Sequence, residues 1–199
     1  MKFLNAAASA LAFLLVPSSG VANDRTAQCL DCHPSRTAPA GSGVPTLAGQ
    51  HPAYIVRQLE RFQAADANDP FLRASTTMAH AEDRLPRSAW ESAAKTLSAQ
   101  DCVYTGNPTQ TALPDNPCAS CHGEHGVSDS PKTPNLAGQN LRYLYYQYQK
   151  LREPYIEGIG VNAGEKEPER LHPVMGPVSA KLRDNVVAAL SYYSKLPCR

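Results

Sequence analysis

Two stretches of the chain share one spacing of apolar residues, with steps of four and then three positions. The first stretch carries Ile55, Leu59 and Phe62, and the second, 89 residues later, carries Leu144, Tyr148 and Leu151. These steps place the apolar side chains on one face of a helix. Pro52 stands where the first turn of a helix tolerates proline. We therefore predict an amphipathic helix in each half, with its apolar face in a core.

Each half ends in a further predicted helix. Ser88, followed three residues later by Glu91, resembles a capping box that opens a helix through about Ser98. In the second half, a cap at Asp184 precedes apolar residues at helical spacing, namely Val187, Leu190 and Tyr193. No alternating pattern of useful length predicts a strand. The expected fold class is all-α, with long loops.

The N-terminus has the features of an export signal. Lys2 precedes a short, mostly apolar run over residues 3–16, and small residues follow at 20–22. The run is shorter than the roughly 20 apolar residues of a membrane-spanning helix. We predict that residues 1–22 are a signal peptide, cleaved before about Asn23; an uncleaved anchor is the alternative.

Charge gives no reason to expect nucleic acid as a partner. Of 19 basic and 18 acidic side chains, cleavage removes only Lys2, which leaves 18 of each sign. Such a balance lacks the excess of positive charge that nucleic-acid binding requires. Length alone allows one domain or two.

Two short motifs carry the chemistry. Each is a Cys-x-x-Cys-His unit, formed by Cys29, Cys32 and His33 and by Cys118, Cys121 and His122. On a helical turn the three side chains share one face. Two sulfurs can then form thioethers with a porphyrin while the imidazole reaches its iron. Zinc held by the motif thiolates is the alternative chemistry.

An internal duplication sets the domain organisation. The hexapeptide Pro45–Gln50 recurs with one substitution as Pro134–Gln139, and its offset of 89 residues equals that between the two cysteine motifs. A shared register of this length indicates a duplicated unit. We predict a first domain over 23–104, a proline-rich linker over 105–117 and a second domain over 118–199.

A haem iron with one histidine ligand needs a sixth partner or an open position. The predicted mature chain has one methionine in each half, Met78 and Met175, each seven residues before a leucine. Their matching positions favour them as the sixth ligands. Nearby histidines, His80 and His172, are the competing ligands, and histidine would lower the reduction potential.

These motifs resemble the dihaem class I c-type cytochromes of the cytochrome c4 type. The resemblance rests on the paired Cys-x-x-Cys-His units, the paired Pro-x-Leu-Ala-Gly-Gln segments, the following Tyr-x-x-x-Gln helices and the C-terminal Met175 region. It implies two tandem cytochrome c-like domains facing each other in a periplasmic electron carrier, with two covalently attached haem c groups. It also implies that the carbonyls of Pro45 and Pro134 accept hydrogen bonds from the two motif histidines.

The first half departs from that family in two places. Pro34 stands where the second half has Gly123, and the first final helix lacks a Tyr-Tyr ending. We therefore expect the first haem site to be the less standard one. Cys102 and Cys198 lie outside the family pattern, and we predict a disulfide that ties the domain ends together. Free or intermolecular thiols, and a cysteine as haem ligand, are the alternatives.

Filled iron coordination predicts electron transfer without catalytic residues. The expected partners are redox proteins, namely a quinol-oxidising complex, a terminal oxidase or a periplasmic dehydrogenase, with docking to a membrane complex. The alternative is a dihaem enzyme or enzyme subunit, for sulfur-compound oxidation or peroxidase-like chemistry, with an open or labile first haem.

Overall fold

A computed structural model describes residues 20–34, 43–63, 71, 73–102, 115–156, 170–182 and 185–198. Over these residues the secondary structure is helical, and the only ladder is an isolated antiparallel bridge between Arg73 and Arg170. The predicted all-α class is confirmed. No helix within the described ranges is long and apolar enough to cross a membrane. The signal peptide and the linker fall largely outside these ranges, so the domain boundaries stay predictions.

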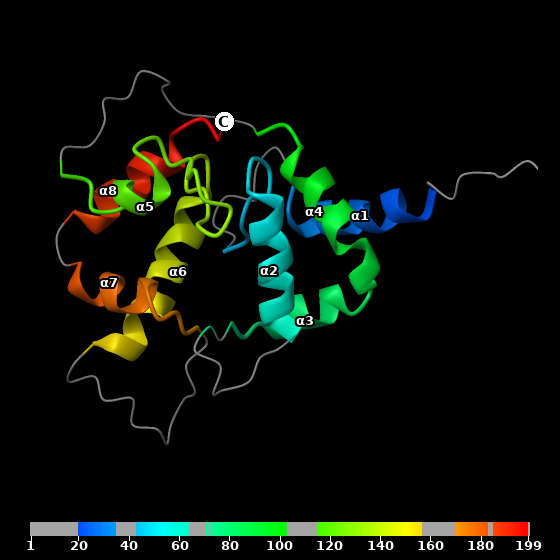
Figure 1. Cartoon of the computed structure of the whole chain (residues 1–199), viewed down its shortest axis with the longest axis horizontal. Helices are drawn as coiled ribbons and strands as arrows, with labels where there is room; N and C mark the ends of the chain where they lie inside the picture. The colour runs from blue at the N-terminus through cyan, green and yellow to red at the C-terminus, as the bar shows by residue number, and fades with distance from the viewer. Residues whose placement is uncertain are drawn as a thin grey trace, which may run out of the picture.

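The first half contains helices α1 (Gly20–Cys32), α2 (Pro52–Gln63), α3 (Thr76–Glu82) and α4 (Trp90–Ser98). Helices α1 and α2 both pack against α4, as Figure 1 shows. Ile55 from α2 joins Ala94 and Leu97 from α4 in one buried cluster. The apolar stripe predicted for α2 therefore lies in the core, and Pro52 begins the helix as expected.

The predicted capping box at Ser88 is wrong. Ser88 lies in a short 3-10 helix, Arg87–Ala89, and α4 begins directly after it, at Trp90, with no side-chain cap. Trp90 explains the difference, because its side chain is only 1% exposed and its indole N–H donates to the Leu85 carbonyl at 3.1 Å. Burying an indole contributes more than a cap worth about 1 kcal/mol.

The second half contains α5 (Ala119–His122), α6 (Leu141–Arg152), the 3-10 helix η2 (Glu153–Tyr155), α7 (Met175–Lys181) and α8 (Val186–Ser194). Helix α6 packs against α7 and α8. Its Leu144 forms a buried cluster with Val186 and Leu190 of α8. The two helices predicted here are confirmed, although Asp184 lies outside the described residues and Asn185 precedes α8 in a left-handed conformation.

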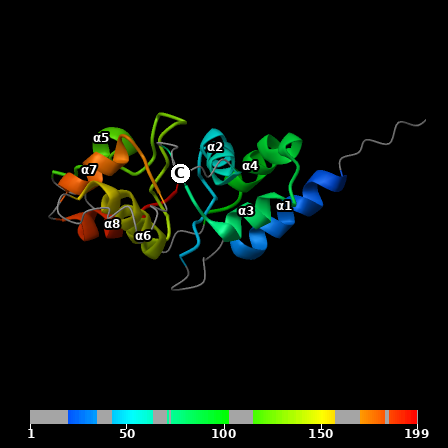
Figure 2. The same cartoon turned by 90° about the horizontal axis from the view of Figure 1, so that it is seen from below.

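The halves lie side by side, with α2 and α6 nearest the junction in both views (Figures 1 and 2). Gln50 donates from Nε2 to the Asn135 carbonyl at 3.0 Å and accepts from the Asn135 N–H at 2.9 Å. Gln139 makes the same pair of bonds to Thr46, at 2.9 and 2.8 Å. Residues 46 and 50 correspond to 135 and 139 in the duplication. The halves are therefore related by a pseudo-twofold axis, with each repeat binding the other through the same glutamine.

Two buried arginines extend this symmetry. Arg73 donates to Gln58 of its own half and to the Tyr143 hydroxyl of the other half, the latter at 2.6 Å. Arg170 donates to Gln147 of its own half and reaches Tyr54 of the first half. The Tyr-x-x-x-Gln segments of α2 and α6 thus supply the junction with its polar contacts. Burial works to raise the pKa of Tyr143, but the nearby guanidinium charges outweigh it and the pKa is lowered.

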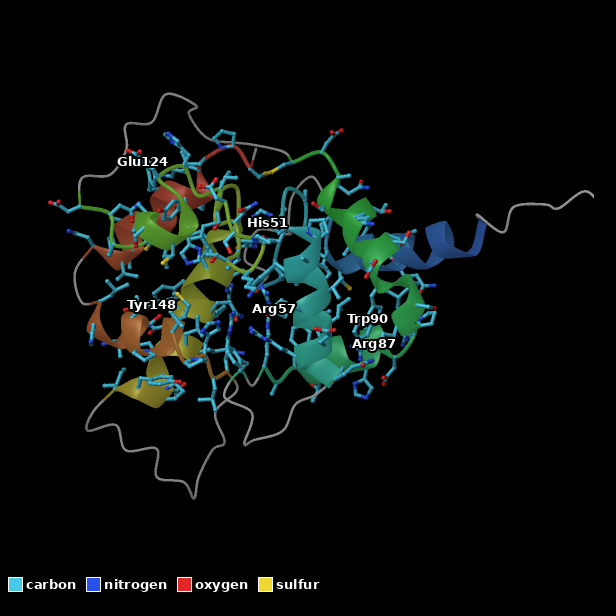
Figure 3. The ribbon with its side chains drawn as sticks, in the orientation of Figure 1. His51, Arg57, Arg87, Trp90, Glu124 and Tyr148 are labelled. Atoms are coloured by element: carbon cyan, nitrogen blue, oxygen red, sulfur yellow. A yellow bond between two sulfur atoms is a disulfide. The ribbon has the colours of Figure 1, made fainter. Side chains whose placement is uncertain are left out.

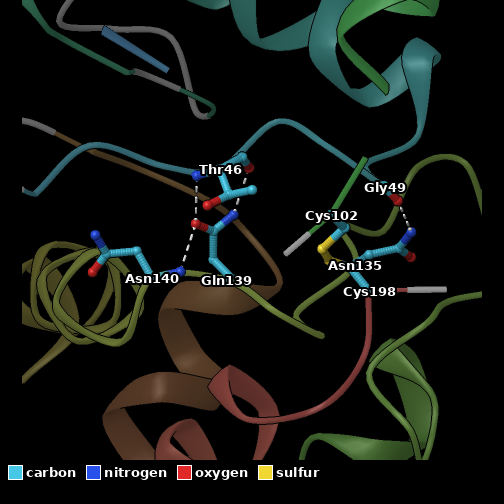
Figure 4. The surroundings of a disulfide bond; sticks show 7 residues. All are labelled: Thr46, Gly49, Cys102, Asn135, Gln139, Asn140 and Cys198. Atoms are coloured by element: carbon cyan, nitrogen blue, oxygen red, sulfur yellow. Dashed lines mark hydrogen bonds between the residues drawn. A yellow bond between two sulfur atoms is a disulfide. The ribbon is translucent and has the colours of Figure 1, made fainter. Parts of the chain in front are cut away.

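A disulfide joins Cys102 to Cys198 beside the axis, with the Cα atoms 6.1 Å apart. The predicted pairing is confirmed. Gly49 and Gly138, equivalent residues with φ of +71° and +65°, lie against it, as Figure 4 shows for Gly49. A Cβ at Gly49 would lie 2.6 Å from the Cys198 carbonyl oxygen. Only glycine combines the left-handed backbone with so close an approach.

Two longer side chains reach across the junction on the face shown in Figure 3. His51 places its Nε2 2.8 Å from the Ser128 carbonyl, and Arg57 donates to the Lys132 carbonyl at 2.6 Å. The only ion pair among the described residues joins Arg87 to Glu60 at 2.9 Å, and Arg87 lies on the outer part of the first half. The junction is therefore held by hydrogen bonds and the disulfide rather than by ion pairs among these residues.

Candidate haem sites

The second Cys-x-x-Cys-His unit forms a single helical turn. The N–H of His122 donates to the Cys118 carbonyl at 2.9 Å, which brings both cysteines and the histidine to one face. The imidazole is buried, with 5% exposed, and its Nδ1 lies 2.8 Å from the carbonyl of Pro134.

The first unit repeats this geometry at the end of α1. The N–H of His33 donates to the Cys29 carbonyl at 2.8 Å, and Nδ1 lies 2.9 Å from the Pro45 carbonyl. Both hydrogen bonds implied by the family resemblance are therefore present. A carbonyl can only accept, so each Nδ1 carries the proton and each Nε2 keeps its lone pair for a metal.

The charge state of the two motif histidines suits metal binding. Burial lowers the pKa of His33 and His122, although the bonds to the proline carbonyls work in the opposite direction. The rings are thus neutral and able to act as ligands near pH 7. Burial also raises the pKa of the Cys29 and Cys118 thiols. All four motif cysteines are free of disulfides in the structure.

The Tyr-Tyr ending of α8 holds the loop that follows the second motif. The Tyr193 hydroxyl donates to the Gly123 carbonyl at 3.1 Å and accepts from Asn116 Nδ2 at 2.8 Å. Its ring also occupies the space beside Gly126, where a Cβ would lie 2.6 Å away. Burial raises the pKa of Tyr193 to about 12, so the hydroxyl keeps the proton it donates. Sequence reasoning noted this tyrosine but did not assign it a contact.

The two methionines occupy equivalent places. Met78 lies in α3 and Met175 begins α7, and both are half-buried. His80 is exposed, and its Nδ1 lies 2.7 Å from the Thr76 carbonyl of its own helix. His172 accepts at Nδ1 from the Met175 N–H at 3.2 Å. Burial, followed by the charges of nearby arginines, lowers the pKa of His172 to about 4.

Three buried side chains near the junction, two arginines and a glutamine, carry hydrogen-bond donors. None of the contacts described above pairs these donors with a carboxylate. Arg73 and Arg170 are each 8% exposed, and the amide nitrogen of Gln58 is buried without a partner in the described part of the chain. An unpaired buried N–H costs roughly 1–3 kcal/mol. Such donors fit a cofactor that carries its own carboxylates, as haem does with its propionates. Zinc lacks comparable support, since no group of three or more potential ligands forms among the residues described.

Each half thus contains a cysteine pair, a neutral histidine oriented by a proline carbonyl, and a methionine on a short helix. These are the groups expected of a c-type cytochrome with two haem sites. The assignment of Cys29, Cys32, Cys118 and Cys121 to attachment, and of His33, Met78, His122 and Met175 to the irons, stays a prediction.

Comparisons with known proteins agree with this class. The family model described as cytochrome c matches residues 108–193. Cytochrome c4 of Thiocapsa roseopersicina is 29% identical, over 83% of this chain and 84% of its own. The thiosulfate dehydrogenase electron acceptor of Stutzerimonas stutzeri is 23% identical, over 88% of this chain and 82% of its own. The crystal structure of reduced recombinant cytochrome c4 from Pseudomonas stutzeri matches with a TM-score of 0.61 and 26% identity, covering 90% of this chain and all of that one.

Fold, motifs and comparisons agree on a dihaem c-type cytochrome of the cytochrome c4 type, as the sequence predicted. The two-domain cytochrome c fold and the two covalently attached haem c groups follow from the same similarities.

Sequence reasoning missed the two junction arginines. A signal was present, since Arg73 and Arg170 each precede the methionine of their half by five residues. The offset between halves is 97 residues at these positions rather than 89, because the second half has eight more residues in the preceding segment. A search confined to the 89-residue register does not align the two arginines.

Proposed function

We propose that this protein is a periplasmic electron carrier whose two haem sites exchange electrons with each other and with redox protein partners. The observation that carries the proposal is that the Cys-x-x-Cys-His unit with its proline-bonded histidine occurs in both halves, and that reciprocal glutamine bonds join the two halves. The haem irons supply one-electron redox chemistry, and the protein supplies attachment, ligands and a fixed separation between the sites.

Each proposed ligand has a defined task. The cysteines would hold the two haems through thioether bonds, while His33 and His122 would bind the irons through Nε2. The proline carbonyls fix the imidazole planes and increase the electron donation of the rings. Met78 and Met175 would be the second protein ligands of the irons and would keep the reduction potentials above those of bis-histidine haems.

The buried guanidiniums have a role in the same proposal. Arg73 and Arg170 place two positive charges at the junction, and the free amide donor of Gln58 lies beside Arg73. These donors would pair with haem propionates, which would lower the cost of burying negative charge near them. Because each arginine also binds a tyrosine of the opposite half, the cofactors and the junction stabilise each other.

Absorption spectra taken through a redox titration test the carrier function. The expected result is two c-type haems in the reduced protein and a methionine-to-iron band in the far red of the oxidised protein. Carbon monoxide should bind the reduced protein slowly and incompletely. Rapid, full binding at one haem would contradict the carrier function and favour an enzyme with an open site.

Export by the predicted signal peptide places the protein in the periplasm, where c-type haems are attached. The partners are then a quinol-oxidising complex or periplasmic dehydrogenase upstream and a terminal oxidase downstream, with docking at the membrane complex. Cell fractionation with a periplasmic marker enzyme tests the location. Recovery with the cytoplasmic marker would refute it.

A second candidate function is that of an electron-accepting subunit for an enzyme that oxidises sulfur compounds. The similarity to a thiosulfate dehydrogenase electron acceptor favours it. Stopped-flow reduction by thiosulfate, alone and with a thiosulfate dehydrogenase, separates the candidates. A subunit is reduced quickly only when that enzyme is present, an enzyme is reduced by thiosulfate alone, and a general carrier responds more rapidly to a quinol-oxidising complex.

A further inference from the structure

His172 binds three consecutive backbone N–H groups at the start of α7. Its ring Nδ1 accepts from Val174 at 3.3 Å and from Met175 at 3.2 Å, and its carbonyl accepts from Gly176 at 2.9 Å. The first N–H groups of a helix have no partner within the helix, and Val174 supplies no side-chain cap to α7. One residue therefore fixes the backbone on both sides of Met175.

The first half contains the same arrangement with a different residue. Ser75 accepts through Oγ from the N–H of Met78 at 3.3 Å, and its carbonyl accepts from Ala79 at 2.9 Å. Ser75 and His172 both lie three residues before the methionine, at the 97-residue offset. The duplication has thus kept an acceptor at this position while changing the side chain that provides it.

The imidazole adds a contact that serine cannot make. The ring of Phe71, from the first half, meets His172 edge to face, with the centroids 5.2 Å apart and an interplanar angle of 85°. The guanidinium of Arg61 on α2 lies 4.7 Å from the centroid of the same Phe71 ring. Edge-to-face pairs of this kind stabilise the packing beyond the burial of the two rings. The segment bearing Met175 is therefore tied to the opposite half of the molecule.

We propose that His172 is a positioning residue for the sixth ligand of the second haem, and that its contact with Phe71 makes this ligation depend on the first half. The proposal rests on the proposed function, in which Met175 binds the iron. His172 is not itself the ligand: its Nδ1 accepts from two backbone N–H groups, so the proton of the neutral ring lies on Nε2, which then has no lone pair for iron. The contact has no counterpart in the first half, where Ser75 has no ring, so the dependence runs in one direction.

Three variants separate the two parts of this role. H172S keeps an acceptor, as the first half does, but loses the ring contact. H172L keeps apolar bulk but loses the acceptor. F71L removes the ring from the first half and leaves His172 intact. His125, an exposed histidine of the second half, provides the control variant H125L. Each holoprotein is examined by the far-red methionine band, by redox titration and by urea unfolding.

H172L should lose the contribution of one haem to the far-red band and lower one reduction potential, with the other unchanged. H172S and F71L should keep the full far-red band in buffer without urea. As urea is added, each variant should lose the contribution of one haem to this band before global unfolding, and at a lower urea concentration than the wild type. H125L should behave like the wild type. A full band and two unchanged potentials in correctly folded H172L would overturn the proposal, as would wild-type urea profiles for both H172S and F71L.

The proposed function fails in a different way. If the band of the wild type is unchanged in M175L, then Met175 is not a ligand, whatever the His172 variants show. If H172S converts one haem to a high-spin form that binds carbon monoxide at once, His172 is the ligand itself and the positioning role is wrong. Loss of secondary structure in H172L is detected by circular dichroism, and H172S then carries the test.

Discussion

The ring of Tyr155 fills the space beside the α-carbon of Gly176, so that a methyl group there would overlap the ring. Tyr155 belongs to η2, and Gly176 follows Met175 directly in α7. The close packing of these two residues fixes the start of α7, in addition to the backbone contacts of His172. A larger side chain at Gly176 should therefore displace the neighbouring Met175.

We expect G176A to destabilise the protein by about 1–3 kcal/mol, because overpacking forces the ring or the helix to move. The far-red methionine band should weaken at the same time. Gly43 provides a matched control, since a Cβ there would lie 3.4 Å from the Tyr146 ring, close to ordinary contact. Urea unfolding and absorption spectra of G176A and G43A measure both effects. Equal stability of the two variants would contradict the packing argument.

Replacing Gln50 or Gln139 by leucine should weaken the junction from either side. Each change leaves backbone groups of the opposite half without partners, at a cost of roughly 1–3 kcal/mol. The pseudo-twofold relation predicts similar losses for Q50L and Q139L. Q63L, at an exposed residue ending α2, should cost much less. Urea unfolding measures all three variants, and a clearly unequal pair of losses would argue against equivalent roles.

Removing the disulfide with the double variant C102S/C198S should lower the free energy of unfolding by roughly 2–5 kcal/mol, as for long closed loops. The two cysteines are 96 residues apart in sequence, so the loop contains almost the whole second half. The variant should keep both haems, because neither cysteine belongs to a haem motif. Pyridine haemochrome spectra count the haems, and urea unfolding with and without reductant measures the stability. A wild-type protein indifferent to reductant would contradict this account.

Y193F tests the clamp on the second motif. The change should cost about 1 kcal/mol near neutral pH through the lost hydrogen bonds. The stability of the wild type also depends on pH, because the pKa of the Tyr193 hydroxyl is about 12 in the folded protein and about 10 in the unfolded chain. The stabilisation from protonated Tyr193 is complete below pH 10 and is lost as pH rises to about 12.

Stability of Y193F should therefore fall less steeply than that of the wild type between pH 10 and 12. Urea unfolding over that range measures the difference in slope. Y146F, at an exposed tyrosine of α6, is the control and should follow the wild type. Parallel slopes for Y193F and the wild type would show that the hydroxyl does not titrate in this range.

A comparison of M78L with H80A tests which residue is the sixth ligand of the first haem. Because Met78 is half-buried and His80 is exposed, M78L should open one haem to carbon monoxide and remove its share of the far-red band. H80A should change neither property. The opposite result would assign the ligand to His80, with a lower potential for the first haem.

The sequence predicted the elements that depend on local pattern. Helical periodicity located α2 and α6, and the duplicated motifs located both histidines and the carbonyls that orient them. The cap at Ser88 failed because burial of Trp90, a tertiary effect, decides where α4 begins. The helix propensities of individual residues do not include the effect of such packing.

Contacts between the halves could not be predicted from one half's pattern. The leucine-alanine-glycine-glutamine segments were visible as repeats, but their partners across the junction depend on how the domains face each other. Gln50, for example, binds Asn135, 85 positions away. The pairing of Cys102 with Cys198 was predictable because the export signal and the two cysteines left over from the haem motifs restricted the alternatives.

The reciprocal bonds of Gln50 and Gln139 have the form of an interface between two identical subunits, in which one patch binds its own copy. A single-domain protein bearing this segment would already possess a self-complementary face. Joining two such units in one polypeptide turns an encounter that depends on concentration into an intramolecular one. The two halves thus bind each other as the subunits of a homodimer would, but within one chain. The two haem sites can then diverge in sequence while the face that joins the halves stays the same.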